Sequence, residues 1–229
     1  MPARQSGFTE ALSQHLHALR RERGALLVGI DGRGAMGKST LAGRLVAAAG
    51  PGAEVLGLDA FFLPVRLHPP FDPARIDHLR TAEIAAVLRA LSAGEEADYR
   101  PYDWETGELG APATIRPGFV IVEGLYALRR EFGRPYDFSI WVEGELRQRM
   151  ERVFARSGGG ATREAARADP FARLWIEEFG PREQAYIEAE RPWERADLVV
   201  AGAGISISEA GRQFLTPASS ELSARPPTP

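Results

Sequence analysis

The chain of 229 residues lacks cysteine, asparagine and long apolar runs. Without cysteine it has no disulfide framework and no thiolate metal site, which favours a reducing cytoplasm. Without asparagine it has no NKxD base-recognition segment, which argues against a guanine-specific switch protein. Runs such as ALLVG and FVIVEG are far shorter than the roughly 20 residues of a membrane helix, and the first residues lack the basic and apolar segments of a secretory signal. We therefore expect a cytoplasmic protein without a membrane partner.

Lysine is almost absent, and the net charge is small. Lys38 is the only lysine among 28 basic residues, and the formal net charge is −3. A general nucleic-acid binder would be basic overall, so we expect no nucleic-acid partner. Any binding of phosphate must therefore come from a local group of residues.

Short apolar runs alternate with helical patterns along the chain. Apolar and β-branched residues fill 25–31, 54–59, 119–124, 137–144 and 196–202, and helical spacing marks 8–23, 81–92 and the segments that begin at Lys38 and Glu145. Strands that alternate with helices indicate a parallel sheet covered on both faces. The sequence therefore predicts an α/β fold whose mostly parallel sheet has five strands.

The domain organisation follows from breaks in this alternation. We expect a helix within 1–24 that packs on a main domain over 25–215. The segment 98–118 is rich in proline, glycine and aromatic residues and is predicted to be a hairpin or loop insertion, a type of element that often carries specificity. The polar, proline-rich segment 216–229 is expected to be a disordered tail.

The segment GRGAMGKST, residues 32–40, matches the phosphate-loop pattern GxxxxGK[ST]. A predicted strand precedes it and a predicted helix follows it, as the pattern requires. Glycines let successive backbone N–H groups surround phosphates, and a compact ammonium fits among phosphate oxygens where a planar guanidinium does not. We predict binding of ATP, with a glycine-rich structural turn as the alternative. The predicted nucleotide-binding residues are Gly32, Arg33, Gly34, Ala35, Met36, Gly37, Lys38, Ser39 and Thr40.

Two carboxylates follow predicted strands, at the edge where open parallel sheets bind their ligands. Asp59 could orient an attacking hydroxyl and accept its proton. The alternative is that it caps the next segment. Glu123 could hold Mg²⁺ together with Ser39, or it could be a structural acid.

Arginines are spaced along one face of the helix predicted from Glu145. Arg149, Arg152 and Arg156 lie three and four residues apart, and Gly158 to Gly160 follow as a candidate hinge. We interpret this segment, about 147–172, as a lid whose Arg149 and Arg152 neutralise charge in the transition state. The alternative is a solvated basic face. The SGGG segment lacks the leucine and glutamine of the LSGGQ signature of transporter ATPases.

Taken in order, these segments resemble the uridine kinase and phosphoribulokinase group of phosphate-loop kinases. The matching pieces are GRGAMGKST, LDAFF, FDPARID, PYDW, VIVEG and LRQRMER. The resemblance implies a three-layer P-loop NTPase fold of the nucleoside-monophosphate-kinase type with a helical lid. It also implies that Asp77 holds sugar hydroxyls, that Tyr102 and Trp104 lie near the acceptor, and that the protein forms a homo-oligomer.

Two positions depart from the pattern of this group. Gly107 stands where uridine-cytidine kinases have the histidine that reads the pyrimidine, and Val153 stands where an aspartate usually follows the second lid arginine. His78, next to Asp77, could replace the missing histidine, but we expect it to be a surface residue near a helix start.

The sequence therefore predicts an ATP- and Mg²⁺-dependent kinase that phosphorylates a hydroxyl of a small nucleoside-like or sugar-like molecule. Its catalytic residues would be Lys38, Asp59, Arg149 and Arg152. A kinase of the same build could act instead on pantothenate, glycerate, nicotinamide riboside or a pentose phosphate. A further alternative is a regulator that binds ATP without transferring phosphate.

Overall fold

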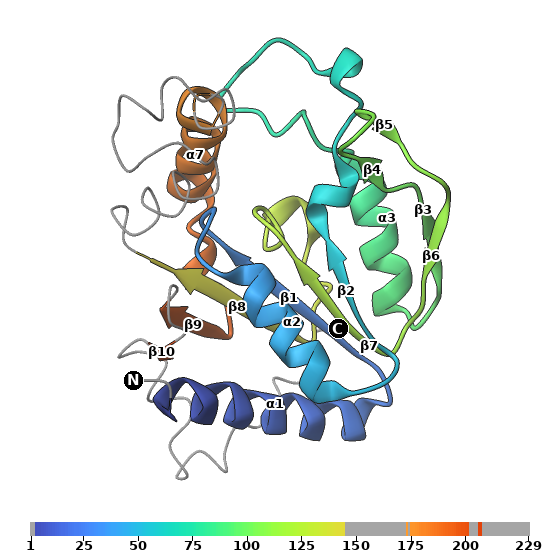
Figure 1. Cartoon of the computed structure of the whole chain (residues 1–229), viewed down its shortest axis with the longest axis vertical. Coiled ribbons are helices and arrows are strands. Elements are labelled where there is room, and N and C mark those ends of the chain that lie inside the picture. The colour runs from blue at the N-terminus through green and yellow to red at the C-terminus, as the bar shows by residue number, and fades with distance from the viewer. Residues whose placement is uncertain (1–2, 145–172, 174, 202–205, 208–229) are drawn as a thin grey trace.

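The computed structural model describes residues 3–144, 173, 175–201 and 206–207, and its centre is a six-stranded sheet (Figure 1). The strand order is β10-β9-β8-β1-β7-β2. Five neighbouring strands are parallel, as predicted, and the short β10 adds an antiparallel edge. The strands are β1 (Leu26–Gly32), β2 (Ala53–Gly57), β7 (Phe119–Glu123), β8 (Phe138–Glu143), β9 (Leu198–Ala201) and β10 (Ser206–Ile207).

The parallel pairing brings three strand ends together. β1 lies between β7 and β8, and Ile30 of β1 is in register with Glu123 of β7. In the next pair, Gly57 of β2 is also in register with Glu123. The carboxyl ends of β1, β7 and β2 therefore meet at one edge of the sheet.

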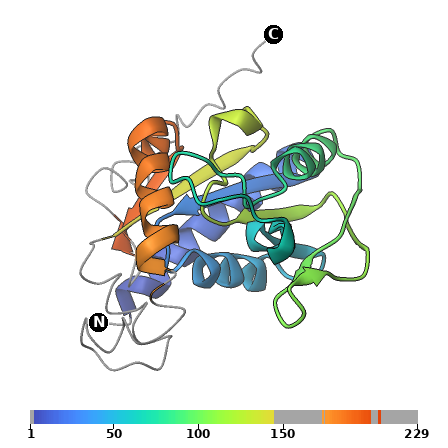
Figure 2. The ribbon, with the colours of Figure 1, turned by 90° about the horizontal axis from the view of Figure 1, so that it is seen from above.

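Helices cover both faces of the sheet, which gives three layers (Figure 2). Side chains of a strand point alternately to its two faces. In β1, Val28 packs with α1 and α2, and its neighbour Leu27 packs with α3 and α7. The α-helices are α1 (Ala3–Arg23), α2 (Lys38–Ala49), α3 (Thr81–Ser92) and α7 (Gly180–Glu190).

Three helices confirm the spacing in the sequence. α3 begins and ends at the residues predicted from the sequence, 81 and 92. α1 begins at Ala3, earlier than the predicted start at residue 8, and ends before Gly24, whose φ is +81°. α2 begins at Lys38 as predicted.

The insertion after α3 forms two small antiparallel pairs, which confirms the predicted hairpin. The outer pair is β3 (Ala97–Tyr99) with β6 (Ala113–Ile115), and the inner pair is β4 (Tyr102–Asp103) with β5 (Glu108–Leu109). Gly107 lies in the turn between the inner strands with a φ of +71°.

Short helical turns complete the described chain. Four are 3-10 helices, η1 (Leu58–Phe61), η2 (Val65–Leu67), η3 (Arg130–Phe132) and η5 (Pro192–Glu194), and η4 (Trp175–Phe179) is a π-helix that leads into α7.

Parts of the sequence prediction lie outside the described residues. They are the lid at 147–172 with Arg149, Arg152 and Val153, and the tail at 216–229. Within the described part of the chain, no helix combines the length and the apolar character needed to cross a membrane.

Candidate functional site

The predicted phosphate loop connects β1 to α2 at the edge where the three strands end. Gly32 has a φ of +149°, and a Cβ there would lie 2.3 Å from the carbonyl oxygen of Val142. Gly37 precedes α2 in the left-handed region with a φ of +95°. Both positions therefore require glycine, because a side chain would clash or strain the backbone.

Lys38 folds back over this loop. Its side chain is nearly buried, and its ammonium Nζ donates to the carbonyl oxygen of Gly32 at 2.8 Å and to that of Arg33 at 3.0 Å. The ammonium therefore lies at the mouth of the loop, next to the N-terminus of α2. A helix N-terminus and an ammonium both favour an anion.

Ser39, in the first turn of α2, lies next to Glu123, the last residue of β7. The Ser39 hydroxyl Oγ donates to Glu123 Oε1 at 3.1 Å. Partial burial raises the pKa of the half-buried Glu123, the charge of Lys38 opposes this shift, and the charge of Asp59 adds to it. The two oxygens suit Mg²⁺, which takes oxygen ligands and is usually held by one or two protein groups together with substrate phosphates. Among the described residues there is no group of three or more histidines or acids that could hold a metal by itself.

Asp59 lies in the first turn of η1, immediately after β2. Its side chain reaches solvent, but the protein around it removes part of its hydration and raises its pKa, while Lys38 opposes the shift. The residue that caps η1 is Gly57, and η1 has no side-chain cap. The structure therefore gives Asp59 no capping role and leaves its carboxylate facing the loop's charge.

The residues predicted for the acceptor gather around Phe62. Its ring centroid is 5.1 Å from that of Trp104 and 5.9 Å from that of Tyr102. Tyr102 is buried, whereas Trp104 is 61% exposed. Trp104 thus presents a large aromatic face to solvent at the insertion, where a ring or an apolar group could stack.

Asp77 is held by arginines. Its Oδ1 accepts from Arg182 at 3.0 Å, and its Oδ2 is 3.1 Å from Arg75 Nε. Partial burial alone would raise the pKa of Asp77, but the hydrogen bond and charge of Arg182 outweigh it and place that pKa below its usual range. Asp77 is therefore ionised near neutral pH.

The expectation that His78 is a surface residue is wrong. Its side chain is only 5% exposed, its ring centroid lies 5.3 Å from that of Phe62, and its Nδ1 accepts from Arg182 at 3.1 Å. Burial first, and then the charge of Arg182, lower the pKa of His78 to about 3. The imidazole is therefore neutral, and the proton lies on Nε2 because Nδ1 accepts.

Sequence reasoning did not single out Asp31, which is fully buried at the end of β1. Its carboxylate accepts from the backbone N–H groups of Gly32, Tyr126 and Leu128 and from the Tyr186 hydroxyl at 2.6 Å. Burial raises the pKa of Asp31 to about 6, because these donors offset only part of the cost of removing the charge from water. The sequence signal that could have pointed to Asp31 is its place directly before Gly32, the first glycine of the loop.

Two further residues that sequence reasoning missed come from α7. Arg182 and Glu183 are adjacent in sequence and both are buried. Arg182 contacts the Asp77 segment, and Glu183 contacts the phosphate loop. The segment 180–190 has neither a motif nor a marked apolar face to indicate these contacts.

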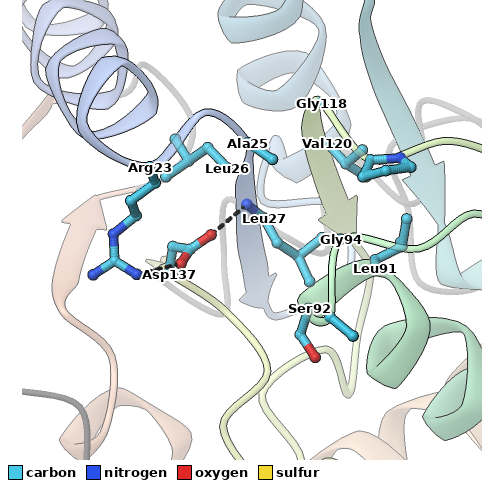
Figure 3. Close-up of a pocket in the computed structure, with 12 residues that line it drawn as sticks. Arg23, Ala25, Leu26, Leu27, Leu91, Ser92, Gly94, Gly118, Val120 and Asp137 are labelled. Atoms are coloured by element: carbon cyan, nitrogen blue, oxygen red, sulfur yellow. Dashed lines mark hydrogen bonds and ion pairs between the residues drawn. The ribbon is translucent and has the colours of Figure 1, made fainter.

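A cavity of about 390 Å³ lies at the opposite edge of the sheet, near the amino ends of β1 and β7 (Figure 3). Arg23 and Asp137 form an ion pair there at 2.6 Å, and Asp137 also accepts from the backbone N–H of Leu27. The cavity shares no residue with the phosphate loop, so the candidate site is defined by the loop edge.

Comparison with solved structures finds the same three-layer α/β fold in several proteins that are described as kinases. A possible uridine kinase from Bacillus stearothermophilus superposes with a TM-score of 0.58 and 21% identity over 82% of this chain and 98% of that one. A protein proposed to be a fructose transport system kinase, from Silicibacter sp. TM1040, gives 0.59 and 24% over 85% and 98%. D-glycerate 3-kinase from Cryptococcus neoformans gives 0.55 and 13% over 88% and 99%.

Comparisons of the sequence alone find no relative. No protein-family model matches the chain, and no curated protein sequence matches it. The structural neighbours are kinases that share the three-layer α/β fold, and their low identity leaves the substrate of this chain open.

Proposed function

We propose that the protein is an ATP- and Mg²⁺-dependent phosphotransferase that moves the γ-phosphoryl group to a hydroxyl of a small molecule. The observation that carries the proposal is the convergence of Lys38, the Ser39–Glu123 pair and Asp59 at one sheet edge. Phosphoryl transfer depends mainly on positioning and on electrostatic stabilisation, and these groups supply both.

The donor half of the reaction uses the phosphate loop. The loop's N–H groups and Lys38 would bind the β- and γ-phosphates, and the ammonium would leave the Gly32 and Arg33 carbonyls to do so. Ser39 and Glu123 would hold Mg²⁺, which when bound neutralises charge on the phosphates.

The acceptor half uses Asp59. Its carboxylate would accept the proton of the acceptor hydroxyl while the hydroxyl oxygen forms its bond to the γ-phosphorus and the bond to the ADP oxygen breaks. A raised pKa makes Asp59 a stronger base than an ordinary aspartate. Arg149 and Arg152 would neutralise charge that develops on the transferred group.

The acceptor is proposed to be nucleoside-like or sugar-like. Asp77 would accept hydrogen bonds from the hydroxyl groups of the acceptor, and Tyr102 and Trp104 would contact the acceptor's apolar face. Because the names of the structural neighbours refer to uridine, fructose and glycerate, acceptors of all three kinds remain candidates. Pantothenate, nicotinamide riboside and pentose phosphates complete the set.

A regulator that binds ATP without transferring phosphate is the second candidate. Such a regulator would need the loop, Lys38 and Ser39. It would have no use for Asp59, a carboxylate next to the loop that caps no helix. The position of Asp59, which caps no helix, favours the kinase.

The test is ADP formation from ATP and Mg²⁺ with a panel of acceptors: uridine, cytidine, other nucleosides, fructose, glycerate, pantothenate and pentose phosphates. A reaction without acceptor and a reaction with EDTA are the controls. A kinase gives a large increase in ADP with one acceptor, and that increase disappears with EDTA. ATP binding without an increase for any acceptor would favour the regulator.

A further inference from the structure

Helix α7 presents two adjacent buried side chains of opposite charge. Arg182 is 4% exposed and Glu183 is 1% exposed. Long charged side chains are rarely buried to this extent unless they are paired. Their partners lie in two segments that are far apart in the sequence, which makes α7 a connection between them.

Glu183 binds the first half of the phosphate loop. Its Oε2 accepts from the backbone N–H of Gly34 at 2.8 Å, and its Oε1 accepts from the Arg33 guanidinium at 3.2 Å. The side chain of the next residue, Gln184, also accepts from Arg33 at 3.0 Å. In Figure 1, α7 stands beside the turn that follows β1.

Arg182 binds the acceptor segment 75–78. One guanidinium nitrogen, Nη1, donates to the carbonyl oxygen of Arg75 at 2.7 Å and to Asp77 Oδ1 at 3.0 Å, and it lies 3.1 Å from His78 Nδ1. The guanidinium also lies over the ring of Phe71, 4.9 Å from its centroid. Arg182 therefore fixes both the carboxylate proposed to bind the acceptor and the tautomer of its neighbouring histidine.

The second half of α7 is anchored independently of these two residues. Tyr186, one turn later on the helix, donates to buried Asp31 at the end of β1. Ile187 packs in the core that α7 shares with α3. One helix, anchored in its second half, thus carries both contacts in its first turn.

We infer that α7 sets the spacing between the ATP site and the acceptor site, with Glu183 as the positioning residue for the phosphate loop and Arg182 as that for segment 75–78. The inference rests on the proposed function, since it takes the loop and Asp77 as the two binding sites. ATP that orders the loop orders α7 through Glu183, and α7 then holds the acceptor segment through Arg182.

The opposite role, in which Glu183 blocks the loop until ATP displaces it, conflicts with the packing. The carboxylate is 1% exposed and accepts from the N–H of Gly34 and from Arg33, and its helix is tied to the core through Tyr186. Displacement by ATP would take this buried carboxylate away from both of these partners. If Glu183 supports the loop, its removal weakens nucleotide binding. If Glu183 blocks the loop, its removal tightens nucleotide binding.

The experiment combines calorimetry with backbone amide exchange, using Mg²⁺ and a non-hydrolysable ATP analogue as the probe. Glu183→Ala should weaken analogue binding by about tenfold, a size common when a supporting hydrogen-bond partner is removed. Glu183→Gln should recover part of the loss, because its amide oxygen still accepts from Gly34. Arg182→Lys should leave analogue affinity unchanged.

Exchange in residues 61–80 reports on the acceptor segment, because the N–H of Leu63 donates to the carbonyl oxygen of His78 and that of Arg80 donates to Phe61. The saturating analogue should slow this exchange in the wild type and not in Glu183→Ala. In Arg182→Lys, the backbone amides of residues 61–80 should exchange faster than in the wild type, with or without the analogue. Ala189→Ser, an exposed change on the same helix, should behave as wild type throughout.

Three results would overturn the inference: analogue binding that Glu183→Ala leaves unchanged or tightens, slowing of 61–80 that survives in Glu183→Ala, or wild-type exchange that the bound analogue does not slow. A wild type that fails to bind the analogue would instead count against the proposed function. In that case the comparison of Arg182→Lys with wild type in the absence of analogue still decides the acceptor half.

Discussion

At the residue scale, Lys38 is the group on which donor binding depends most. The ammonium donates to two loop carbonyls in a nearly buried position, and it is the one charged group of the loop next to the N-terminus of α2 that has this compact shape. A guanidinium is planar and longer, so it cannot sit at the mouth of the loop in the same way.

Lys38→Arg should therefore reduce acceptor-dependent ADP formation by about a hundredfold or more, the usual cost of losing one group that stabilises transition-state charge. Steady-state kinetics measures this loss, and thermal unfolding checks that the variant is folded. The matched control is Arg44→Lys, an exposed exchange in the opposite direction on the same helix. Near-normal turnover in Lys38→Arg would remove the role given to the ammonium.

Asp31 is the residue whose protonation should affect stability. Its pKa rises to about 6 in the folded protein from 3.8, so the folded state binds the proton more tightly than the unfolded state. Stability from this group is therefore present at low pH and is lost as pH rises through 6. Over two pKa units this loss amounts to up to about 3 kcal/mol.

Asp31→Asn removes the titration but keeps the size of the side chain. The variant should be less stable than wild type, because an amide nitrogen now faces N–H and O–H donors. The difference between the two proteins should shrink as pH rises from 4 to 7, and urea unfolding at several pH values measures it. A difference that stays constant or grows would mean that the four donors keep the carboxylate ionised.

The residues of the loop could be predicted because one short segment contains the whole pattern. Gly37 and Lys38 depend on local backbone geometry at the start of α2, and Gly32 belongs to the same segment of nine residues although its need for glycine also comes from Val142. The partners of this loop are distant in sequence: Glu183 lies 149 residues from Gly34. Such contacts depend on how α7 packs, which no local pattern reveals.

At the scale of elements, the predicted strands and helices with strong apolar patterns are found. α3 was predicted at its observed bounds because Ile84, Val87, Leu88 and Leu91 form one buried stripe. α7 was missed, since Pro181 lies in its first turn, Pro192 follows its end, and charged residues occupy two of its four buried positions. Tertiary hydrogen bonds from Arg182 and Glu183 take the place of an apolar stripe there.

α1 shows what an apolar stripe contributes to stability. Leu12 and Leu16 are fully buried in the core that α1 shares with α2 and the sheet. Leu12→Ala or Leu16→Ala should each lower the free energy of unfolding by about 3 kcal/mol, because each removes buried methyl groups and leaves a cavity.

Urea unfolding measures this loss, with Gln14→Ala on the exposed side of the same helix as the control. Loss of stability in the control equal to that in Leu12→Ala would mean that helix propensity, and not core packing, holds α1. Activity per folded molecule should remain unchanged in all three variants, because α1 contributes no residue to the phosphate loop and neither Asp59 nor Glu123.

At the scale of the whole molecule, the sheet order explains why the site could be predicted in outline. A parallel sheet places every strand's carboxyl end at one edge, so residues such as Asp59 and Glu123 that follow strands had to meet the loop. The acceptor side was harder to predict. It depends on how the hairpin insertion and segment 75–78 fold against α7, and burial of His78 follows from that packing.

In the proposed reaction, Asp59 activates an acceptor hydroxyl for attack on ATP bound by the loop. The most direct measurement is transfer itself: mass spectrometry of the acceptor selected by the panel, with wild type and Asp59→Asn compared at saturating ATP and Mg²⁺. Calorimetry with the non-hydrolysable analogue runs in parallel.

We predict that wild type adds one phosphoryl group to the acceptor and that Asp59→Asn binds the analogue normally but transfers at least about a hundredfold more slowly, as expected for loss of a general base. Transfer at the wild-type rate by Asp59→Asn would contradict the account, and so would a wild type that binds the analogue and phosphorylates no acceptor in the panel.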